Sequence, residues 1–329
     1  MITRRQFLAG LAAGGAALAL SGCGVPNGPA APSARQRRIW AVSDCHIGLG
    51  GEANDGRDGA AWLALAVAEQ RKSQPRPDYV LALGDLSHTS RAEELSRYTA
   101  IRDSADMGPW FEIAGNHDFS AFGNGAWDKV IGRPARYTLL DGNTAFIFAS
   151  AEQGSAAGLL SDATLAWMAG EIDRRKDGNV IVCTHQPMFG TVDKSREPGR
   201  FMLHEQAVAR LVEEHRVDLW LCGHIHSGPR TPGYVVTRGR TTFVNIASAG
   251  HAYGTGRTVS YSFTAADGSR TLTGRCRDHE ARQFLADNDV RVELPHPWKL
   301  GDRPILLPAD MPRTPATRPA PAFEHKAAE

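Results

Sequence analysis

The sequence predicts an α/β protein in which buried strands alternate with amphipathic helices. Apolar runs of strand length are separated by segments with helical spacing over most of residues 38–276. Hydrophobic residues make up 42% of the 329 residues, which suits a globular protein with a sizeable core. Together, the alternation and the composition indicate layers of sheet and helix.

Nine apolar runs have the length and the flanking residues of strands. They are Ile39–Ser43, Tyr79–Leu83, Trp110–Ala114, Thr144–Ser150, Val180–Thr184, Val217–Cys222, Thr242–Ala247, Thr258–Thr264 and Ser269–Arg275. The last three follow one another without intervening helices. They therefore suggest an antiparallel addition or a second sheet.

Four segments between these runs show helical spacing. They are Gly59–Lys72, Arg91–Asp103, Asp162–Lys176 and His204–His215. In the first, Trp62, Leu65 and Ala66 fall on one helical face, and the segment ends in polar residues. Ser161 or Asp162 could cap the third helix, since both residue types favour the N-cap position.

Charge gives little support for a nucleic-acid polymer as partner. The chain has 37 Lys and Arg against 36 Asp and Glu, and residues 1–23 contain two of the arginines. Cleavage after residue 22 would leave 35 minus 36, a net charge of −1. No broad basic surface is expected from this balance, so we expect no binding to a nucleic-acid backbone.

The N-terminus reads as a targeting segment. Arg4 and Arg5 precede a short Ala- and Gly-rich apolar run, which resembles a twin-arginine signal. The run Leu20-Ser21-Gly22-Cys23 resembles a bacterial lipobox, with Cys23 as the lipidated residue. Residues 1–23 would then be the signal and residues 24–37 a flexible tether. The alternative is a membrane anchor, but the apolar stretch is short for a span.

This signal predicts export through the twin-arginine machinery and an extracytoplasmic protein held at the membrane by a lipid on Cys23. Four further cysteines remain, at positions 45, 183, 222 and 276. Their spacing matches no Cys-x-x-Cys metal site, so we interpret them as buried thiols, although the sequence leaves a disulfide open.

The C-terminal part differs in composition from the rest of the chain. Eight prolines lie between Pro295 and Pro321 in mostly polar company. This composition resists regular packing, so we expect a folded domain over residues 38–276 and an irregular or disordered segment over residues 277–329.

Five of the predicted strands end in polar residues that can bind metals. The runs are followed by Asp44-Cys45-His46, Gly84-Asp85, Gly115-Asn116-His117-Asp118, His185 and Gly223-His224-Ile225-His226. In open α/β sheets, sites form beyond the carboxyl ends of the strands. Side chains two apart in extended chain face the same way, so Asp44 can converge with His46, and His224 with His226. Taken singly, each of these residues is more often an ordinary loop or turn residue.

The types of ligand residue narrow the range of metal ions that the site would bind. Imidazole and carboxylate without thiolate suit Mn, Fe, Zn, Ni or Co better than Ca or Mg alone. Seven ligands exceed the three or four protein ligands of a lone catalytic zinc. A pair of metal ions that share one carboxylate uses all seven, and such pairs lie roughly 3.5–4 Å apart.

At these motifs the sequence resembles the calcineurin-like metallophosphoesterase family. The motifs are D-C-H at 44–46, G-D at 84–85, G-N-H-D at 115–118, H at 185 and G-H-I-H at 223–226. They occur in order over about residues 38–250. The resemblance implies a four-layer α/β/β/α sandwich of two mixed sheets flanked by helices, and a phosphoesterase with two divalent transition-metal ions such as Mn, Fe or Zn.

The resemblance also implies a role for each residue. Asp44, His46 and His226 would hold the first metal, and Asn116, His185 and His224 the second, while Asp85 would bridge both. A bridging hydroxide would attack phosphorus. His117 would act near the leaving oxygen as general acid or charge stabiliser, with Asp118 orienting its imidazole.

Two features refine the branch of the family. Purple acid phosphatases have a tyrosine three residues after the bridging aspartate, where this chain has His88. The segment 158–187, with Trp167, looks more like the bacterial phosphodiesterase branch, which includes class III cyclic nucleotide phosphodiesterases. We expect His88 to face solvent or to lie behind the ligands, although it could reach the substrate.

We therefore expect an exported phosphodiesterase that acts on a small phosphate ester. A phosphomonoesterase, a catalytically inactive metal-binding scaffold and a metal-storage protein are the alternatives. Lys194, Arg196 and Arg200 lie in a polar loop after His185. They could contact a substrate phosphate, but a charged loop is more often simply solvated.

Overall fold

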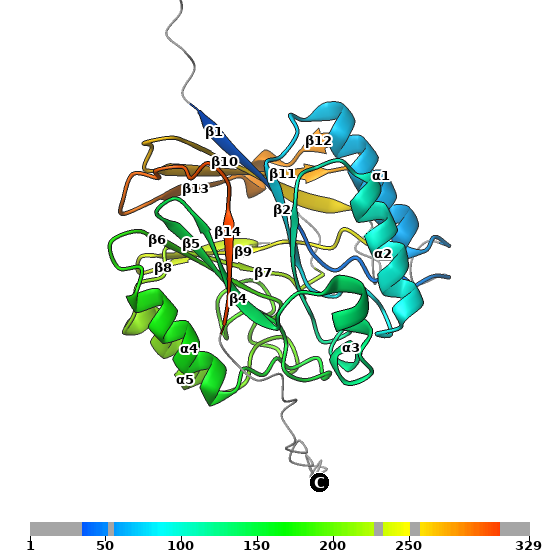
Figure 1. The fold of residues 1–329 in the computed structure, drawn as a ribbon, viewed down its shortest axis with the longest axis horizontal. Coiled ribbons are helices and arrows are strands. Elements are labelled where there is room, and N and C mark those ends of the chain that lie inside the picture. Colours follow the sequence, from blue (N-terminus) through cyan, green and yellow to red (C-terminus); the bar gives the residue numbers. More distant parts are fainter. Residues whose placement is uncertain (1–34, 52–55, 227–232, 251–256, 310–329) are drawn as a thin grey trace, which may run out of the picture. The chain divides into compact units, whose positions relative to one another are not determined.

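The computed structural model describes residues 35–51, 56–226, 233–250 and 257–309. Within them, two seven-stranded sheets pack face to face, and helices cover the outer face of each sheet (Figure 1). The predicted signal, Cys23 and most of the predicted tether lie outside the described residues.

The first sheet combines three parallel strands with an antiparallel extension. Its strands run in the order β12 (Gln283–Phe284), β11 (Thr271–Asp278), β10 (Val259–Ala266), β1 (Gln36–Val42), β2 (Tyr79–Leu83) and β3 (Trp110–Ile113), and β13 (Val290–Glu293) pairs with β11. Strands β1, β2 and β3 are parallel, and β10 and β11 are antiparallel to their neighbours. The expectation of an antiparallel addition is confirmed for these last strands.

The second sheet has the same mixed character. Its order is β14 (Ile305–Pro308), β4 (Arg136–Asp141), β5 (Thr144–Ala149), β6 (Asn179–Thr184), β7 (Leu219–Cys222), β9 (Thr241–Asn245) and β8 (Val235–Arg238). Strands β5, β6, β7 and β9 are parallel, while β14, β4 and β8 are antiparallel to their neighbours. The sequence pattern did not predict β4 or β8.

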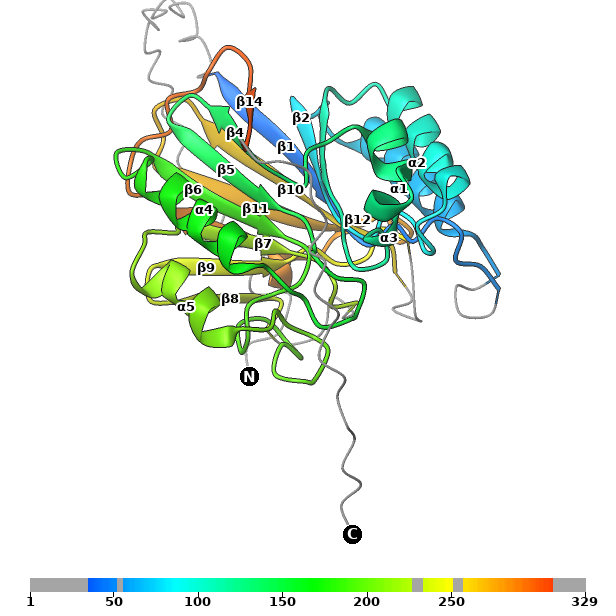
Figure 2. The same cartoon turned by 60° about the horizontal axis from the view of Figure 1, so that its bottom comes forward.

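The helices lie on the two outer faces. Helices α1 (Gly59–Ser73) and α2 (Ala92–Ser104) cover the first sheet, and α4 (Asp162–Asp173) and α5 (Glu205–Glu213) cover the second (Figure 2). Shorter segments are α3 (Ser120–Gly123), the π-helix η2 (Trp127–Ile131) and the 3₁₀ helix η4 (Ala286–Asn288). Ser161 caps α4 by accepting a hydrogen bond from the Thr164 amide, as the sequence suggested.

Alternation along the central strands explains why there are four layers. In β1, Ile39 and Ala41 pack into the core between the two sheets, while Trp40 and Val42 pack beneath α1 and α2. Strand β6 divides in the same way between the inter-sheet core and the core beneath α4 and α5. A strand that is apolar on both faces needs cover on both faces. The predicted four-layer α/β/β/α sandwich is confirmed.

The expectation of an irregular or disordered segment after residue 276 is wrong for residues 277–309. Strands β12 and β13 pair with β11, and β14 pairs with β4, so this segment contributes to both sheets. Trp298 is fully buried between the sheets, and its indole nitrogen donates to the Asp141 carbonyl. A short apolar run flanked by prolines can therefore form an edge strand, as β14 does in the second sheet. Residues 310–329 lie outside the described residues.

Two further expectations concern the cysteines and the membrane. The four cysteines that the structure describes are free and buried, which confirms their interpretation as buried thiols. No helix among the described residues has the length and hydropathy of a membrane span, and the apolar run of the predicted signal lies outside these residues.

We predict that the buried carboxylate on β3 stabilises the strand that leads into the Asn116 turn. Glu112 is fully buried and pairs with Arg102 at 2.8 Å and Arg133 at 2.9 Å. Glu112→Ala leaves both guanidinium groups without this partner, so unfolding in urea should show a loss of about 3 kcal/mol.

Glu293→Ala is the matched control, because Glu293 is also on a strand of the first sheet and also pairs with an arginine. Both members of that pair are exposed, so the loss should be within about 0.5 kcal/mol. Equal losses for the two variants would contradict the assigned role of Glu112.

Candidate metal centre

The five strand ends that the sequence singled out meet at one edge of the two sheets. Strands β1, β2 and β3 of the first sheet and β6 and β7 of the second are followed directly by the predicted ligands. Hydrogen bonds join the two sheets here, from His185 Nδ1 to the Leu83 carbonyl and from the His224 amide to Asp44 Oδ2. The facing sheets thus contribute to a single site.

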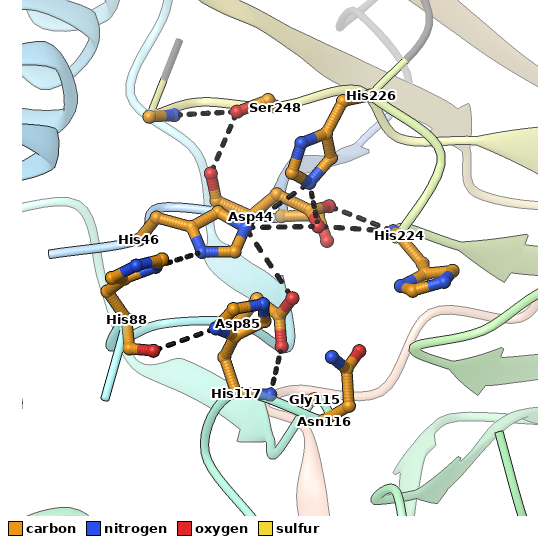
Figure 3. Close-up of polar contacts among 12 residues, drawn as sticks. Asp44, His46, Asp85, His88, Gly115, Asn116, His117, His224, His226 and Ser248 are labelled. Carbon is orange, nitrogen blue, oxygen red and sulfur yellow. Dashed lines mark hydrogen bonds and ion pairs between the residues drawn. The ribbon is translucent and has the colours of Figure 1, made fainter. Parts of the chain in front are cut away.

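The first group of ligand atoms comes from four side chains that point toward one another (Figure 3). Asp44, His46, Asp85 and His226 each offer an atom within 4.8 Å of the others. The Nε2 atoms of His46 and His226 are 3.2 Å apart, and His226 Nε2 lies 2.8 Å from Asp44 Oδ1. His46 Nε2 is 3.5 Å from Asp85 Oδ2.

The second group shares Asp85 with the first. Asp85, His185 and His224 also place one ligand atom each within 4.8 Å of one another. His185 Nδ1 donates to the Leu83 carbonyl at 2.7 Å, and His224 Nε2 donates to the Gly199 carbonyl at 3.0 Å. Each ring is therefore fixed through one nitrogen and has the other free, as metal-binding histidines usually are.

The environment of one buried nitrogen of His185 fits a metal ion. Among the described residues, His185 Nε2 makes no hydrogen bond, and it faces Asp85 Oδ2 at 3.1 Å, a distance at which the protonated ring forms an ion pair. A buried polar atom without a partner is costly unless something else satisfies it. A divalent cation would satisfy this nitrogen and the adjacent carboxylate together.

Asn116 completes the predicted ligand set. It lines the same cavity as His46, Asp85, His224 and His226. Its Oδ1 accepts a hydrogen bond of 3.1 Å from the Gln186 amide, which holds the side chain while a second lone pair stays available. The structure thus brings all seven predicted ligands together, and their binding of metal stays a prediction.

Several of these residues have an unusual backbone conformation. Asp44, His46, Asp85 and His224 have φ angles of 54°, 44°, 50° and 67°. Residues other than glycine adopt this left-handed region at a cost of order 1–3 kcal/mol, and such strain concentrates at functional sites. These strained turns after the strands carry four of the predicted ligands, of which His46, Asp85 and His224 line the cavity.

The buried carboxylates control the charge of the site. Burial alone would raise the pKa of Asp85, but His185 and His46 hold it well below its ordinary value. Burial likewise lowers the pKa of His185, but Asp85 and Asp44 offset this and raise it to about 9. In the absence of metal, the two carboxylates therefore favour the protonated, positively charged form of His185. A bound metal cation would supply this positive charge in place of the proton.

The structure corrects the expected partner of His117. Its Nδ1 donates to the His88 carbonyl at 2.7 Å, and its ring stacks on the His88 ring at a centroid distance of 4.9 Å (Figure 3). The Asp118 carboxylate instead accepts hydrogen bonds from Leu86, Ser87 and Gly115. Asp118 shapes the loops behind the centre, and His88 orients His117.

His88 is the residue whose position the sequence left undecided. Its Nδ1 lies 3.4 Å from His46 Nδ1, so it contacts a predicted ligand as well as His117. This agrees with a position behind the ligands. The spacing of three residues from Asp85 gave its place in the loop, but no sequence pattern could show the stacking.

Known proteins resemble this chain in sequence and in fold. A family model for the calcineurin-like phosphoesterases matches residues 37–228. A probable glycerophosphodiester phosphodiesterase GpdQ of Arcobacter nitrofigilis is 24% identical over 200 residues, which are 56% of this chain and 70% of that protein.

A purple acid phosphatase from seeds of yellow lupin (Lupinus luteus) superposes with a TM-score of 0.58 at 14% sequence identity. The match covers 79% of this chain and 54% of the phosphatase, so the chain spans about half the length of that protein. At this identity the likeness supports the fold alone.

We predict that Gly115 is needed because a side chain there would displace the shared carboxylate. A Cβ at this position would lie 2.1 Å from Asp85 Oδ1 and 2.5 Å from the Asp85 amide nitrogen. Gly115→Ala should therefore lower metal affinity by about 10- to 100-fold, the range seen when groups that support ligands are disturbed. Titration of the metal-free protein with Mn²⁺ measures this change.

Gly123→Ala is the control, because a Cβ at Gly123 would meet no atom within 4 Å. Its Mn²⁺ affinity should equal that of the wild type. If Gly115→Ala also binds Mn²⁺ like the wild type, the carboxylate of Asp85 is not part of the metal site.

Proposed function

This chain belongs to the calcineurin-like phosphoesterase family, whose model matches residues 37–228, and we propose that it is a metal-dependent hydrolase of phosphate diesters. The observation that carries the proposal is the shared position of Asp85 in both ligand groups. One carboxylate between two sets of imidazoles is suited to two neighbouring metal ions. The family predicted from the sequence motifs is confirmed, and the finer assignments are proposals.

The donor atoms support two divalent transition-metal ions, with Mn, Fe and Zn as candidates. Asp44, His46 and His226 would hold one ion, and Asn116, His185 and His224 the other. Asp85 is placed to contact both. When bound, the ions would supply positive charge that polarises the phosphoryl oxygens and makes water a better nucleophile.

We propose that His117 serves the leaving group. Because its Nδ1 proton is committed to the His88 carbonyl, Nε2 is the nitrogen that can hold and release a proton. The ring lines the cavity beside Asp85 and Asn116. We assign His117 Nε2 the delivery of a proton to the leaving oxygen.

A diester is favoured over a monoester for two reasons. The chain is related over 200 residues to a probable glycerophosphodiester phosphodiesterase. The cavity at the centre has a volume of about 460 Å³, which is large enough for a phosphate with two small substituents. Both observations favour a substrate with two ester groups.

We also propose that the protein acts outside the cytoplasm, attached to the membrane through Cys23. Arg4, Arg5 and the Leu20–Cys23 run support this location. The twin-arginine route exports proteins that have already folded, so metal could be bound before export. Extracytoplasmic nucleotides, phospholipid headgroups and wall phosphodiesters are then accessible substrates.

The hydrolysis is tested with the Mn²⁺-loaded full chain. It should release p-nitrophenol from bis-p-nitrophenyl phosphate faster than from p-nitrophenyl phosphate, and a chelator should abolish both reactions because the ligand residues alone cannot activate water. Faster release from the monoester would favour the phosphomonoesterase alternative. Absence of turnover with both esters would sink the proposal.

Two variants separate an enzyme from a metal-storage protein. Asp85→Asn should lose metal and activity together. His117→Asn should retain both metal ions while kcat for a diester with an alkyl leaving group falls by about 100-fold or more, since an alkoxide cannot leave readily without a proton. A His117→Asn variant with unchanged kcat would remove the assigned acid from the mechanism.

Export has its own test, by fractionation of cells that produce variant chains. Arg4→Lys combined with Arg5→Lys should block twin-arginine export, and Cys23→Ala should release the exported protein from membranes. Cys222→Ala is the control for loss of a thiol, because Cys222 is buried and free. Unchanged fractionation of both signal variants would contradict the proposed location.

A further inference from the structure

The cavity lining consists of two parts with different chemistry. One part is the predicted ligands together with His117. The other comes largely from the loop at residues 187–203, between β6 and α5, and includes Lys194, Pro198, Gly199 and Arg200. Two cationic side chains therefore lie on the same cavity as the metal centre but outside its ligand set.

The loop is held in a defined position by its own hydrogen bonds and by its neighbours. The Met202 amide donates to the Pro187 carbonyl at 3.0 Å and closes the loop at its base. The Leu203 amide donates to the Gly158 carbonyl at 2.7 Å, and the Gly158 amide donates to the Phe201 carbonyl at 3.0 Å. The backbone that carries the two cations is thus anchored at both ends.

Arg200 is tied closely to the metal centre. The carbonyl of the preceding residue, Gly199, accepts the hydrogen bond of 3.0 Å from the ring of His224. Arg200 therefore directly follows the residue whose carbonyl orients the predicted ligand His224. Its side chain is on the cavity and exposed to solvent.

Within the parts of the chain that the structure describes, Lys194 and Arg200 take part in no ion pair, and both are exposed. Arg196 in the same loop differs, because its guanidinium lies over the Phe189 ring at 5.1 Å and does not line the cavity. The three cations that the sequence grouped together therefore separate into two that face the cavity and one that packs on an aromatic ring.

We propose that Lys194 and Arg200 form a subsite for a second anionic group of the substrate, such as a carboxylate or a phosphate. This inference rests on the proposed diesterase function. A diester phosphate carries one negative charge. With two divalent ions bound, the centre would have a net charge of +2 once the negative charges of Asp44 and Asp85 are subtracted. The metal ions would already balance the single negative charge of this phosphate. The positive charges of Lys194 and Arg200 therefore complement another negative group on the same substrate molecule.

The test uses two substrates that differ only in one charge. These are p-nitrophenyl phenyl phosphate and p-nitrophenyl 4-carboxyphenyl phosphate, which share the same leaving group. The Mn²⁺-loaded wild type should have the higher kcat/KM for the carboxylated diester. The double variant Lys194→Ala/Arg200→Ala should lower the ratio of the two kcat/KM values by about tenfold, as expected for two solvent-exposed charge contacts.

Arg196→Ala is the matched control, since it removes a cation from the same loop without changing the cavity lining. Its ratio should equal that of the wild type. A ratio that is the same in the wild type and the double variant would overturn the subsite. A ratio that falls as much in Arg196→Ala would show a general effect of net charge and would overturn it as well.

Binding separates this inference from the proposed hydrolysis. Calorimetric titration of the Mn²⁺-loaded protein with 4-carboxyphenyl phosphate and phenyl phosphate should show tighter binding of the carboxylated compound, and the double variant should lose this preference. If the wild type cleaves neither diester, the proposed function fails, but the binding preference still decides the subsite. Equal affinities of the wild type for the two compounds would refute it.

Discussion

The burial of two carboxylates among four imidazoles is the interaction on which the site depends. Asp44 and Asp85 are almost completely shielded from water, and a carboxylate in such surroundings must be matched by positive charge. The protein matches them with histidines, one of which, His185, has a buried nitrogen that faces Asp85 and makes no hydrogen bond within the described residues. Metal cations would meet the remaining demand, and the shared position of Asp85 divides the donor atoms into two sets.

The fold satisfies this demand by placing two sheets face to face. Neither sheet alone holds the complete ligand set, because Asp44 and Asp85 follow strands of the first sheet, while His185 and His224 follow strands of the second. The inter-sheet core fixes the two edges against each other, and ion pairs such as that of Glu112 stabilise the strands from behind. Strained turns then direct the side chains into the cavity, and packing elsewhere offsets their conformational cost.

Local patterns in the sequence predicted the alternation of strands and helices and the polar residues at the strand ends, whereas the four-layer arrangement followed from the family resemblance. Apolar runs that end in Asp, Asn or His indicate both a buried strand and its polar end. The role of Asp118 and the position of His88 could not be predicted, since they depend on contacts between loops that are distant in sequence. Strand β14 was missed for a related reason, because two prolines flank a short apolar run whose partner, β4, lies far away in the chain.

The central claim is that Asp85 lies between two metal ions. Anomalous diffraction from crystals of the Mn²⁺-loaded protein tests it directly. We predict two peaks roughly 3.5–4 Å apart, with the Asp85 carboxylate between them, Asp44 at one peak and Asn116 at the other. A single peak, or two peaks of which only one contacts Asp85, would contradict the assignment of a shared carboxylate.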